Sequence, residues 1–181
     1  MPITHVFKRW SWIAAVAASF LVVESSQCRA AVLHVGGSTV SITPDQPVAL
    51  AGQMHTRISR DVRSPVTANA LALESRDGDN VLDQALMISC DLVAVEPGII
   101  DQVRQRLKKQ LPDFDVDKLV LSATHTHTAP VLEEGKYEIP KDGVMQPSAY
   151  LAFLTERLVQ AAARAWESRR PARAGWGLGH A

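Results

Sequence analysis

From residue 31 onward, apolar residues recur in two alternating patterns, and this alternation restricts the chain to a small set of folds. Runs with a period of two, or short continuous apolar runs, predict strands. Stretches in which apolar residues recur every three or four positions predict amphipathic helices. The predicted strands are 32–35, 38–43, 68–74, 84–93, 119–123 and 172–181, and the predicted helices follow Pro97 as far as Pro112 and cover 148–168. This order favours one α/β domain in which helices cover a mixed β-sheet.

Two turn signals connect the predicted strands in the first half of this domain. Gly36-Gly37 separates two short runs, which predicts an early hairpin. Asp77-Gly78 lies between the runs 68–74 and 84–93, and an Asp-Gly step is a strong hairpin signal. We therefore expect two hairpins before the first helix of the domain.

The first thirty residues have the order of a secretory signal peptide. Lys8-Arg9 precedes an apolar stretch from Trp10 to Val23, and Cys28-Arg29-Ala30 places small residues where signal peptidase reads them. The apolar stretch is shorter than the ~20 residues that a membrane-spanning helix needs, and a retained membrane anchor is the alternative. We expect residues 1–30 to be removed and residues 31–181 to be secreted or periplasmic.

Charge and cysteine content exclude several classes of function. The sequence has 19 basic and 19 acidic residues and a formal charge of zero, without a cluster of Lys and Arg, so we expect no nucleic-acid partner. Once residues 1–30 are removed, Cys90 is the only cysteine, which excludes an intramolecular disulfide. It lies between Ser89 and Asp91 in an apolar run, which predicts a buried and unreactive thiol, not a catalytic nucleophile.

The most informative segment for chemistry is the predicted strand 119–123 with the histidines that follow it. His125 and His127 are two residues apart, and in an extended backbone such side chains project to the same face. Imidazole nitrogens are good zinc ligands, and catalytic zinc sites typically combine three protein ligands with a water. The interleaved threonines favour extended backbone and can hold the imidazoles in one tautomer. The pair predicts a metal or catalytic site, with surface or hydrogen-bonded core histidines as the alternative.

The segment around these histidines resembles a motif of the neutral and alkaline ceramidases. Ser122–Pro130 reads Ser-Ala-Thr-His-Thr-His-Thr-Ala-Pro, against Ser-Ala-Thr-His-Thr-His-Ser-Gly-Pro in that family. Val40–Pro44 is similar to the family's Asp-Ile-Thr-Pro element, Leu50–Gly52 to its Leu-x-Gly step, and Ile88–Leu92 to its Ser-Leu-Asp-Leu strand. The resemblance extends over nearly all of residues 31–181.

This resemblance implies a zinc-dependent amide hydrolase that converts N-acyl lipids such as ceramide into a sphingoid base and a fatty acid. It assigns His125 as a zinc ligand and His127 as a catalytic or substrate contact. The family's other zinc ligands, a second His, a Glu and a Tyr, are implied to lie beyond residue 181. Residues 31–181 would then be the N-terminal portion of an incomplete catalytic domain, inactive by itself.

A lipid substrate also implies peripheral contact with a membrane surface, whereas nothing in the sequence predicts an oligomeric state. Two alternatives to this function stay open. One is a metal-dependent hydrolase of another amide or ester. The other is a secreted, non-catalytic binding domain, or a truncated remnant, with the same fold.

Four further features support weaker hypotheses. Asp91 is either a hydrogen-bond partner of a histidine or a strand-end turn residue. His55 is expected to be solvated and outside the site. The three arginines between residues 57 and 63 are expected to be solvated, with binding of an anionic head group as the alternative. Residues 133–137, within the long stretch 131–146, are expected to form a lid over the site, with disorder as the alternative.

Overall fold

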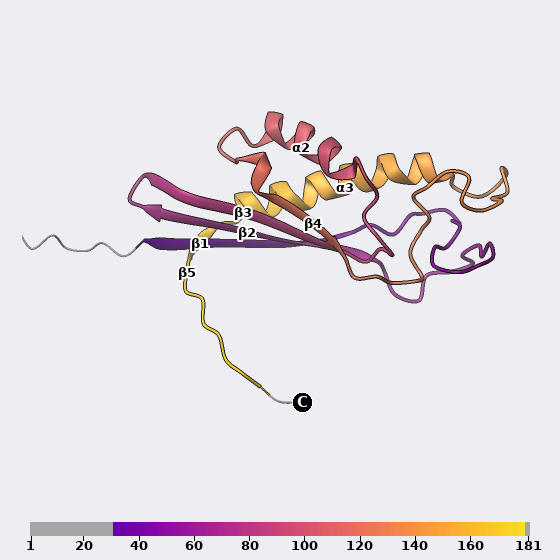
Figure 1. The fold of residues 1–181 in the computed structure, drawn as a ribbon, viewed down its shortest axis with the longest axis horizontal. Helices are drawn as coiled ribbons and strands as arrows, with labels where there is room; N and C mark the ends of the chain where they lie inside the picture. The colour runs from indigo at the N-terminus through magenta and orange to yellow at the C-terminus, as the bar shows by residue number, and fades with distance from the viewer. Residues whose placement is uncertain (1–30, 180–181) are drawn as a thin grey trace, which may run out of the picture. The chain divides into compact units, whose positions relative to one another are not determined.

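The computed structural model of the protein describes residues 31–179, and the predicted signal peptide lies outside this range. Five strands of this part form one sheet in the order β4-β3-β2-β1-β5 (Figure 1). The strands are β1 (Val32–Ser41), β2 (Thr67–Asp77), β3 (Asn80–Cys90), β4 (Leu119–Ala123) and β5 (Arg170–Ala172). Neighbouring strands are antiparallel except β3 and β4, which are parallel. The sheet is therefore mixed, and the predicted α/β class is confirmed.

Two helices cover one face of this sheet (Figure 1). α2 (Ile99–Gln110) lies in the crossover between β3 and β4, and the short 3-10 helix η2 (Val116–Lys118) follows it. α3 (Pro147–Glu167) packs against β1 and β2. It begins with a proline, whose missing N–H costs no helical hydrogen bond in the first turn. Both helices were predicted from their apolar periods, because each has one continuous face to bury.

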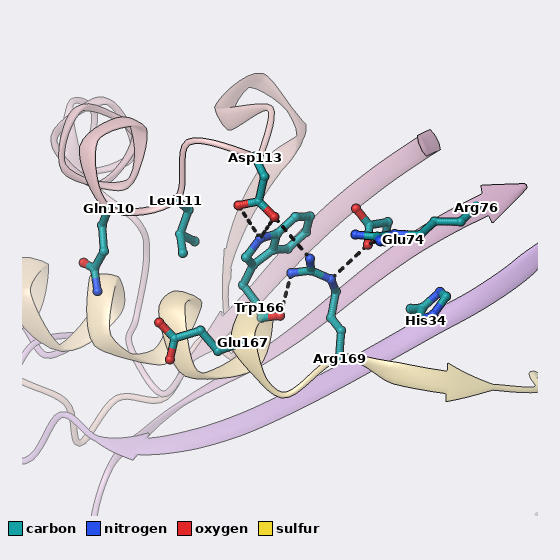
Figure 2. A pocket seen from close by; sticks show the side chains of 9 residues that line it. All are labelled: His34, Glu74, Arg76, Gln110, Leu111, Asp113, Trp166, Glu167 and Arg169. Atoms are coloured by element: carbon teal, nitrogen blue, oxygen red, sulfur yellow. Dashed lines mark hydrogen bonds and ion pairs between the residues drawn. The ribbon is translucent and has the colours of Figure 1, made fainter. Parts of the chain in front are cut away.

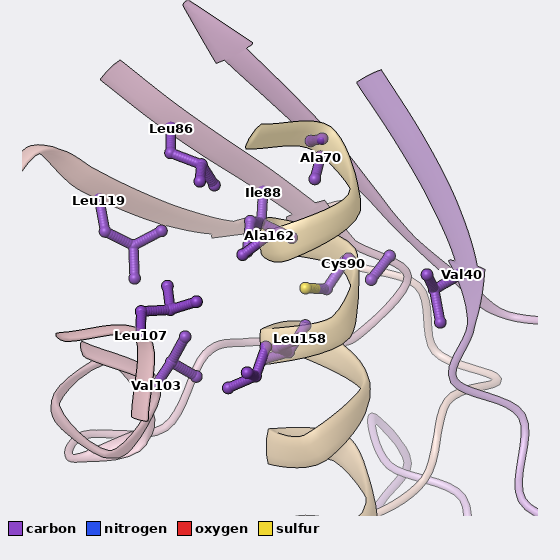
Figure 3. Packing of buried hydrophobic residues seen from close by; sticks show 14 of the residues in the cluster. Val40, Ala70, Leu86, Ile88, Cys90, Val103, Leu107, Leu119, Leu158 and Ala162 are labelled. Carbon is purple, nitrogen blue, oxygen red and sulfur yellow. The ribbon is translucent and has the colours of Figure 1, made fainter. Parts of the chain in front are cut away.

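The hydrophobic core lies between the two helices and the sheet (Figure 3). β3 contributes Leu86, Ile88 and Cys90 at alternate positions, each at most 1% exposed. Val103 of α2 and Leu158 of α3 are fully buried in the same cluster. Burial raises the pKa of the Cys90 thiol to about 12, because the thiolate would lose its hydration. The prediction that this thiol is buried is confirmed.

Gly36-Gly37 is not a turn, so the prediction of an early hairpin is wrong. β1 runs without interruption through both glycines and pairs with β2 on one side and β5 on the other. A Cβ atom at position 36 would overlap the carbonyl oxygen of Ala165 in α3. Glycine is needed there because the helix backbone approaches the strand closely, which local sequence signals do not report.

The two other local predictions had different outcomes. The hairpin at Asp77-Gly78 is confirmed, since β2 and β3 pair up to Asp77 and Asn80 and Gly78 adopts a φ of 60° in the turn. The predicted strand 172–181 is wrong, because only Arg170–Ala172 pairs with β1 and residues 173–179 have no regular structure. Three glycines in that stretch provide no side chain to bury against the sheet.

A network of charged side chains fastens the C-terminal end of α3 to β2 (Figure 2). Glu74 is 1% exposed, and its carboxylate accepts hydrogen bonds from Arg76 at 2.7 Å and from Arg169 at 3.2 Å. The guanidinium of Arg169 also stacks on the ring of Trp166, whose indole N–H donates to Asp113. These residues line a cavity of about 400 Å³. Because its carboxylates are already paired, we interpret the network as stabilising the fold.

The helices leave the other face of the sheet open over residues 31–179. Leu71 of β2, Met87 of β3 and Val120 of β4 are direct cross-strand neighbours on this face. Each of the three side chains is between 41% and 50% exposed. The apolar row therefore has no cover within the part of the chain that the structure describes.

Candidate active site

The two histidines follow the C-terminal end of β4, at one edge of the sheet. The N–H of Thr124 donates to the carbonyl of Cys90 at 2.9 Å, and the N–H of Thr126 donates to the carbonyl of Leu92 at 3.0 Å. Between them, His125 adopts a φ of 63°, in the left-handed region that is uncommon for a residue with a side chain. Such a conformation persists only where the surrounding structure imposes it, and it is frequent at functional sites.

The imidazoles of His125 and His127 converge. Their Nε2 atoms are 3.2 Å apart, and the ring centroids are separated by 4.8 Å in an edge-to-face arrangement. The expectation that both rings lie on one side is confirmed, but the reason differs from the predicted one. An extended strand was expected to align them, whereas the chain turns at His125 immediately after β4 has ended.

The hydrogen bond of His125 determines which of its nitrogens is free. Its Nδ1 lies 2.8 Å from the carbonyl oxygen of Val93. A carbonyl can only accept, so Nδ1 carries the hydrogen and Nε2 of the neutral ring offers a lone pair. In metal-binding histidines, the ring nitrogen that does not bind the metal commonly donates to a carbonyl or carboxylate in this way, which orients the ring.

The spacing of the two Nε2 atoms is compatible with a shared zinc ion. Two nitrogens of a tetrahedral zinc site, each about 2.0–2.1 Å from the metal, are about 3.3–3.4 Å apart. The observed 3.2 Å is close to this value, and it also suits a hydrogen bond from His127 to the lone pair of His125. The residues present therefore fit a metal site at this position.

Three residues that the sequence analysis did not assign to the site contact the histidines. Val93 is the partner of His125, as described above. Gly52 lies against the imidazole of His127, since a Cβ at position 52 would be 2.5 Å from two ring atoms. Arg57, expected to be solvated, donates from Nη2 to the carbonyl oxygen of His127 at 2.6 Å. No local signal marks these contacts, because the partners lie between 32 and 75 positions away along the chain.

Asp91 and His55 are not partners of the imidazoles. The Asp91 carboxylate accepts hydrogen bonds from the backbone and hydroxyl of Thr67, at 2.9 and 2.8 Å, and from the hydroxyl of Thr124 at 3.3 Å. It thereby ties the start of β2 to the segment that follows β4, which agrees with the strand-end interpretation. His55 is exposed, and no hydrogen bond joins it to either histidine.

A groove of about 840 Å³ lies beside the same segment. Thr126 and Thr128, and not the two histidines, form part of its wall. Its other lining residues include the three arginines between positions 57 and 63 and an apolar group, Val48, Leu50 and Ile58. Its volume is in the range of small-molecule sites.

The stretch 131–146 has no helix or strand but is held against the loop that follows Pro47. The hydroxyl of Tyr137 donates to the carbonyl of Gln53 at 2.6 Å, and the N–H of Met145 donates to the carbonyl of Pro47 at 2.8 Å. These hydrogen bonds fix the path of the stretch, so the alternative that it lacks fixed structure is not supported. Its role as a lid stays a prediction.

The described residues bring together fewer ligand side chains than a catalytic zinc site typically uses. Within residues 31–179, no group of three or more His, Cys, Asp or Glu side chains is arranged to hold a metal ion. The described helices also include none with the length and apolar character needed to cross a membrane.

The fold and the histidine pair define an α/β domain with a candidate metal site, and its fold is that of part of the neutral ceramidases. The crystal structure of neutral ceramidase from Pseudomonas aeruginosa matches 78% of this chain, with a TM-score of 0.65 and 19% sequence identity. A second structure, a ceramidase complexed with C2, also matches 78% of it, with a TM-score of 0.61 and 17% identity. This chain covers 22% of the length of each. No family model and no curated protein matches the sequence.

Proposed function

We propose that this chain forms the N-terminal part of an exported, zinc-dependent amide hydrolase of the neutral ceramidase type. The observation that carries the proposal is the histidine pair, with Nε2 atoms 3.2 Å apart at the end of a sheet with the ceramidase fold. The sequence resemblance around Ser122–Pro130 supports the same conclusion. Support for zinc comes from the Nε2 lone pair of His125, which is left free because Nδ1 bonds to the Val93 carbonyl.

In this proposal His125 holds the metal through Nε2, while the Val93 carbonyl fixes its tautomer. Bound zinc would supply an activated water and polarise the amide carbonyl of the substrate. His127 lies close enough to His125 to face the same reacting atoms. Its role is to donate a hydrogen bond to the oxyanion that develops on the carbonyl, or to pass a proton to the leaving amine.

The proposed substrate is the amide of an N-acyl lipid such as ceramide. The groove of about 840 Å³ begins on the threonine side of the histidine segment, and its wall of Val48, Leu50 and Ile58 can bury an acyl chain. Such a substrate would bring the protein to a membrane surface. Export to the periplasm or the medium is proposed from the signal-like residues 1–30.

The test compares His125→Ala, His127→Ala and the parent in the complete protein in which this chain occurs. We would measure zinc content beside hydrolysis of a fluorescent N-acyl sphingosine. His125→Ala should lose zinc and hydrolysis together, because a metal ligand is removed. His127→Ala should keep zinc and lose about 100-fold to 1,000-fold in turnover, as expected for one transition-state donor.

His55→Ala is the matched control, because His55 is exposed and has no hydrogen bond to either histidine. It should keep both zinc and activity. Zinc-dependent hydrolysis at the parent rate by His125→Ala would contradict the proposal. A parent protein that retains zinc but hydrolyses no amide would instead support the non-catalytic binding domain.

A further inference from the structure

A loop between residues 49 and 58 is fixed to the segment that carries the second histidine. The N–H of Ala51 donates to the carbonyl of Ala129 at 2.9 Å, and the N–H of Val131 donates to the carbonyl of Ala49 at 2.9 Å. Leu50 and Pro130 form a bridge between these two bonds. The loop thus follows the chain from 129 to 131 as a short antiparallel pair, just after His127.

Gly52 provides the wall against which the His127 ring rests. Its φ is 87°, and a Cβ built on it would lie 2.5 Å from Cγ and 2.5 Å from Nδ1 of His127. Real Cβ atoms do not approach other atoms so closely. The imidazole therefore occupies the volume that any side chain at position 52 would need.

Arg57 holds the backbone of the same residue. Its Nη2 donates to the carbonyl oxygen of His127 at 2.6 Å, a charge-assisted hydrogen bond. Over residues 31–179, this carbonyl is the one hydrogen-bond acceptor found for the Arg57 side chain, and no carboxylate lies within ion-pairing distance of its guanidinium. The bond restrains the peptide that follows the left-handed turn at His125.

We infer that Gly52 and Arg57 are positioning residues, which together hold the His127 imidazole with its Nε2 toward His125. Gly52 determines where the ring can lie, and Arg57 determines where its backbone lies. Without either of them, the exposed imidazole is free to adopt other rotamers. The consequence for catalysis rests on the proposed function, but the arrangement of the rings does not.

The first test uses two glycines with the same backbone conformation. Gly98 also has a φ of 87°, but a Cβ built there meets nothing within 4 Å. Gly52→Ala and Gly98→Ala therefore share the backbone strain, and only Gly52→Ala adds the collision with His127. An NMR cross-peak between the two imidazoles should be present in the parent chain and in Gly98→Ala, and absent in Gly52→Ala.

The second test removes the hydrogen bond without adding bulk. Arg57→Met should weaken the cross-peak between the rings, and Arg57→Lys, which keeps a charged donor, should restore part of it. Arg60→Met is the control, because Arg60 lines the same groove and is exposed. Zinc titrated alone into each chain should bind to Gly52→Ala and Arg57→Met as it does to the parent, because His125, the proposed zinc ligand, keeps its hydrogen bond to Val93 in both variants.

An inter-ring cross-peak as strong in Gly52→Ala and Arg57→Met as in their controls would overturn the inference. Should Gly52→Ala fail to fold, the comparison of Arg57→Met with Arg57→Lys decides it. In the complete protein, Gly52→Ala and Arg57→Met should lower kcat with little change in KM. If the variants displace the rings but the parent shows no zinc-dependent hydrolysis, the positioning role is supported and the proposed function is rejected.

Discussion

Adjacent glycines on β1 offer a direct test of how closely α3 approaches the sheet. Gly36 faces the helix, where a Cβ would overlap the Ala165 carbonyl oxygen. The same Cβ would lie 2.8 Å from Ser168 Oγ and 2.9 Å from the backbone nitrogen of Arg169. Gly37 faces the open side, where the nearest atom to a Cβ is 3.7 Å away. Gly36→Ala and Gly37→Ala therefore make the same chemical change in opposite environments.

The expected difference in stability follows from these contacts. Gly36→Ala must displace the backbone of α3, so its cost should lie at the upper end of the ~1–3 kcal/mol typical of overpacking. Gly37→Ala creates no clash and lowers the entropy of the unfolded chain, so it should stabilise by about 0.4–1 kcal/mol. The resulting gap of about 3.4–4 kcal/mol between the two variants corresponds to roughly 7–16 °C in Tm for a domain of about 150 residues.

The assay is thermal and urea unfolding of both variants and the parent, followed by circular dichroism. The urea slopes should agree, so that the midpoints report stability and not a change in compactness. Equal losses in the two variants would refute the reasoning, because both positions would then need glycine for their backbone conformation, as in a turn. Equal stability of all three proteins would show that α3 does not approach β1 closely.

Three further predictions concern the buried charge, the thiol and the signal peptide. Burial raises the pKa of Glu74, but hydrogen bonds from Arg76 and Gln84 and the nearby positive charges outweigh it, so the folded pKa is lowered from 4.5. The ionised group therefore stabilises the fold above about pH 4.5, and this contribution is lost as the pH falls through the folded pKa. Urea unfolding of Glu74→Gln should show a loss of about 3 kcal/mol at neutral pH and a weaker dependence on acid than the parent, with exposed Glu156→Gln as the neutral control. Cys90 should resist a thiol reagent at pH 8 until denaturant is added, because burial raises its pKa to about 12, and fast labelling of the folded protein would contradict this. N-terminal sequencing of the exported protein should begin near Ala31, whereas soluble cytoplasmic protein with intact residues 1–30 would reject the signal peptide.

The sequence by itself determined the parts of this protein that depend on local periodicity. α2 and α3 were predicted because each has one apolar face, and the β2–β3 hairpin because an Asp-Gly step favours its turn. The location of His125 and His127 directly after a strand also followed from the sequence. So did the buried state of Cys90, since it lies within an apolar run.

Only the tertiary structure decided the features that depend on contacts between distant segments. Gly36 was interpreted as a turn because nothing in its neighbourhood reports that α3, about 130 residues later, crosses there. The left-handed backbone at His125 lies between hydrogen bonds to Cys90, at the end of β3, and to Leu92, just after it. The alternation of side chains along an extended strand therefore predicted the correct side for both rings, but for the wrong reason. Val93, Gly52 and Arg57 reach the two histidines from other loops. Their roles arise from packing between segments that are far apart in the chain. Such packing produces no periodic pattern of residues from which it could be predicted.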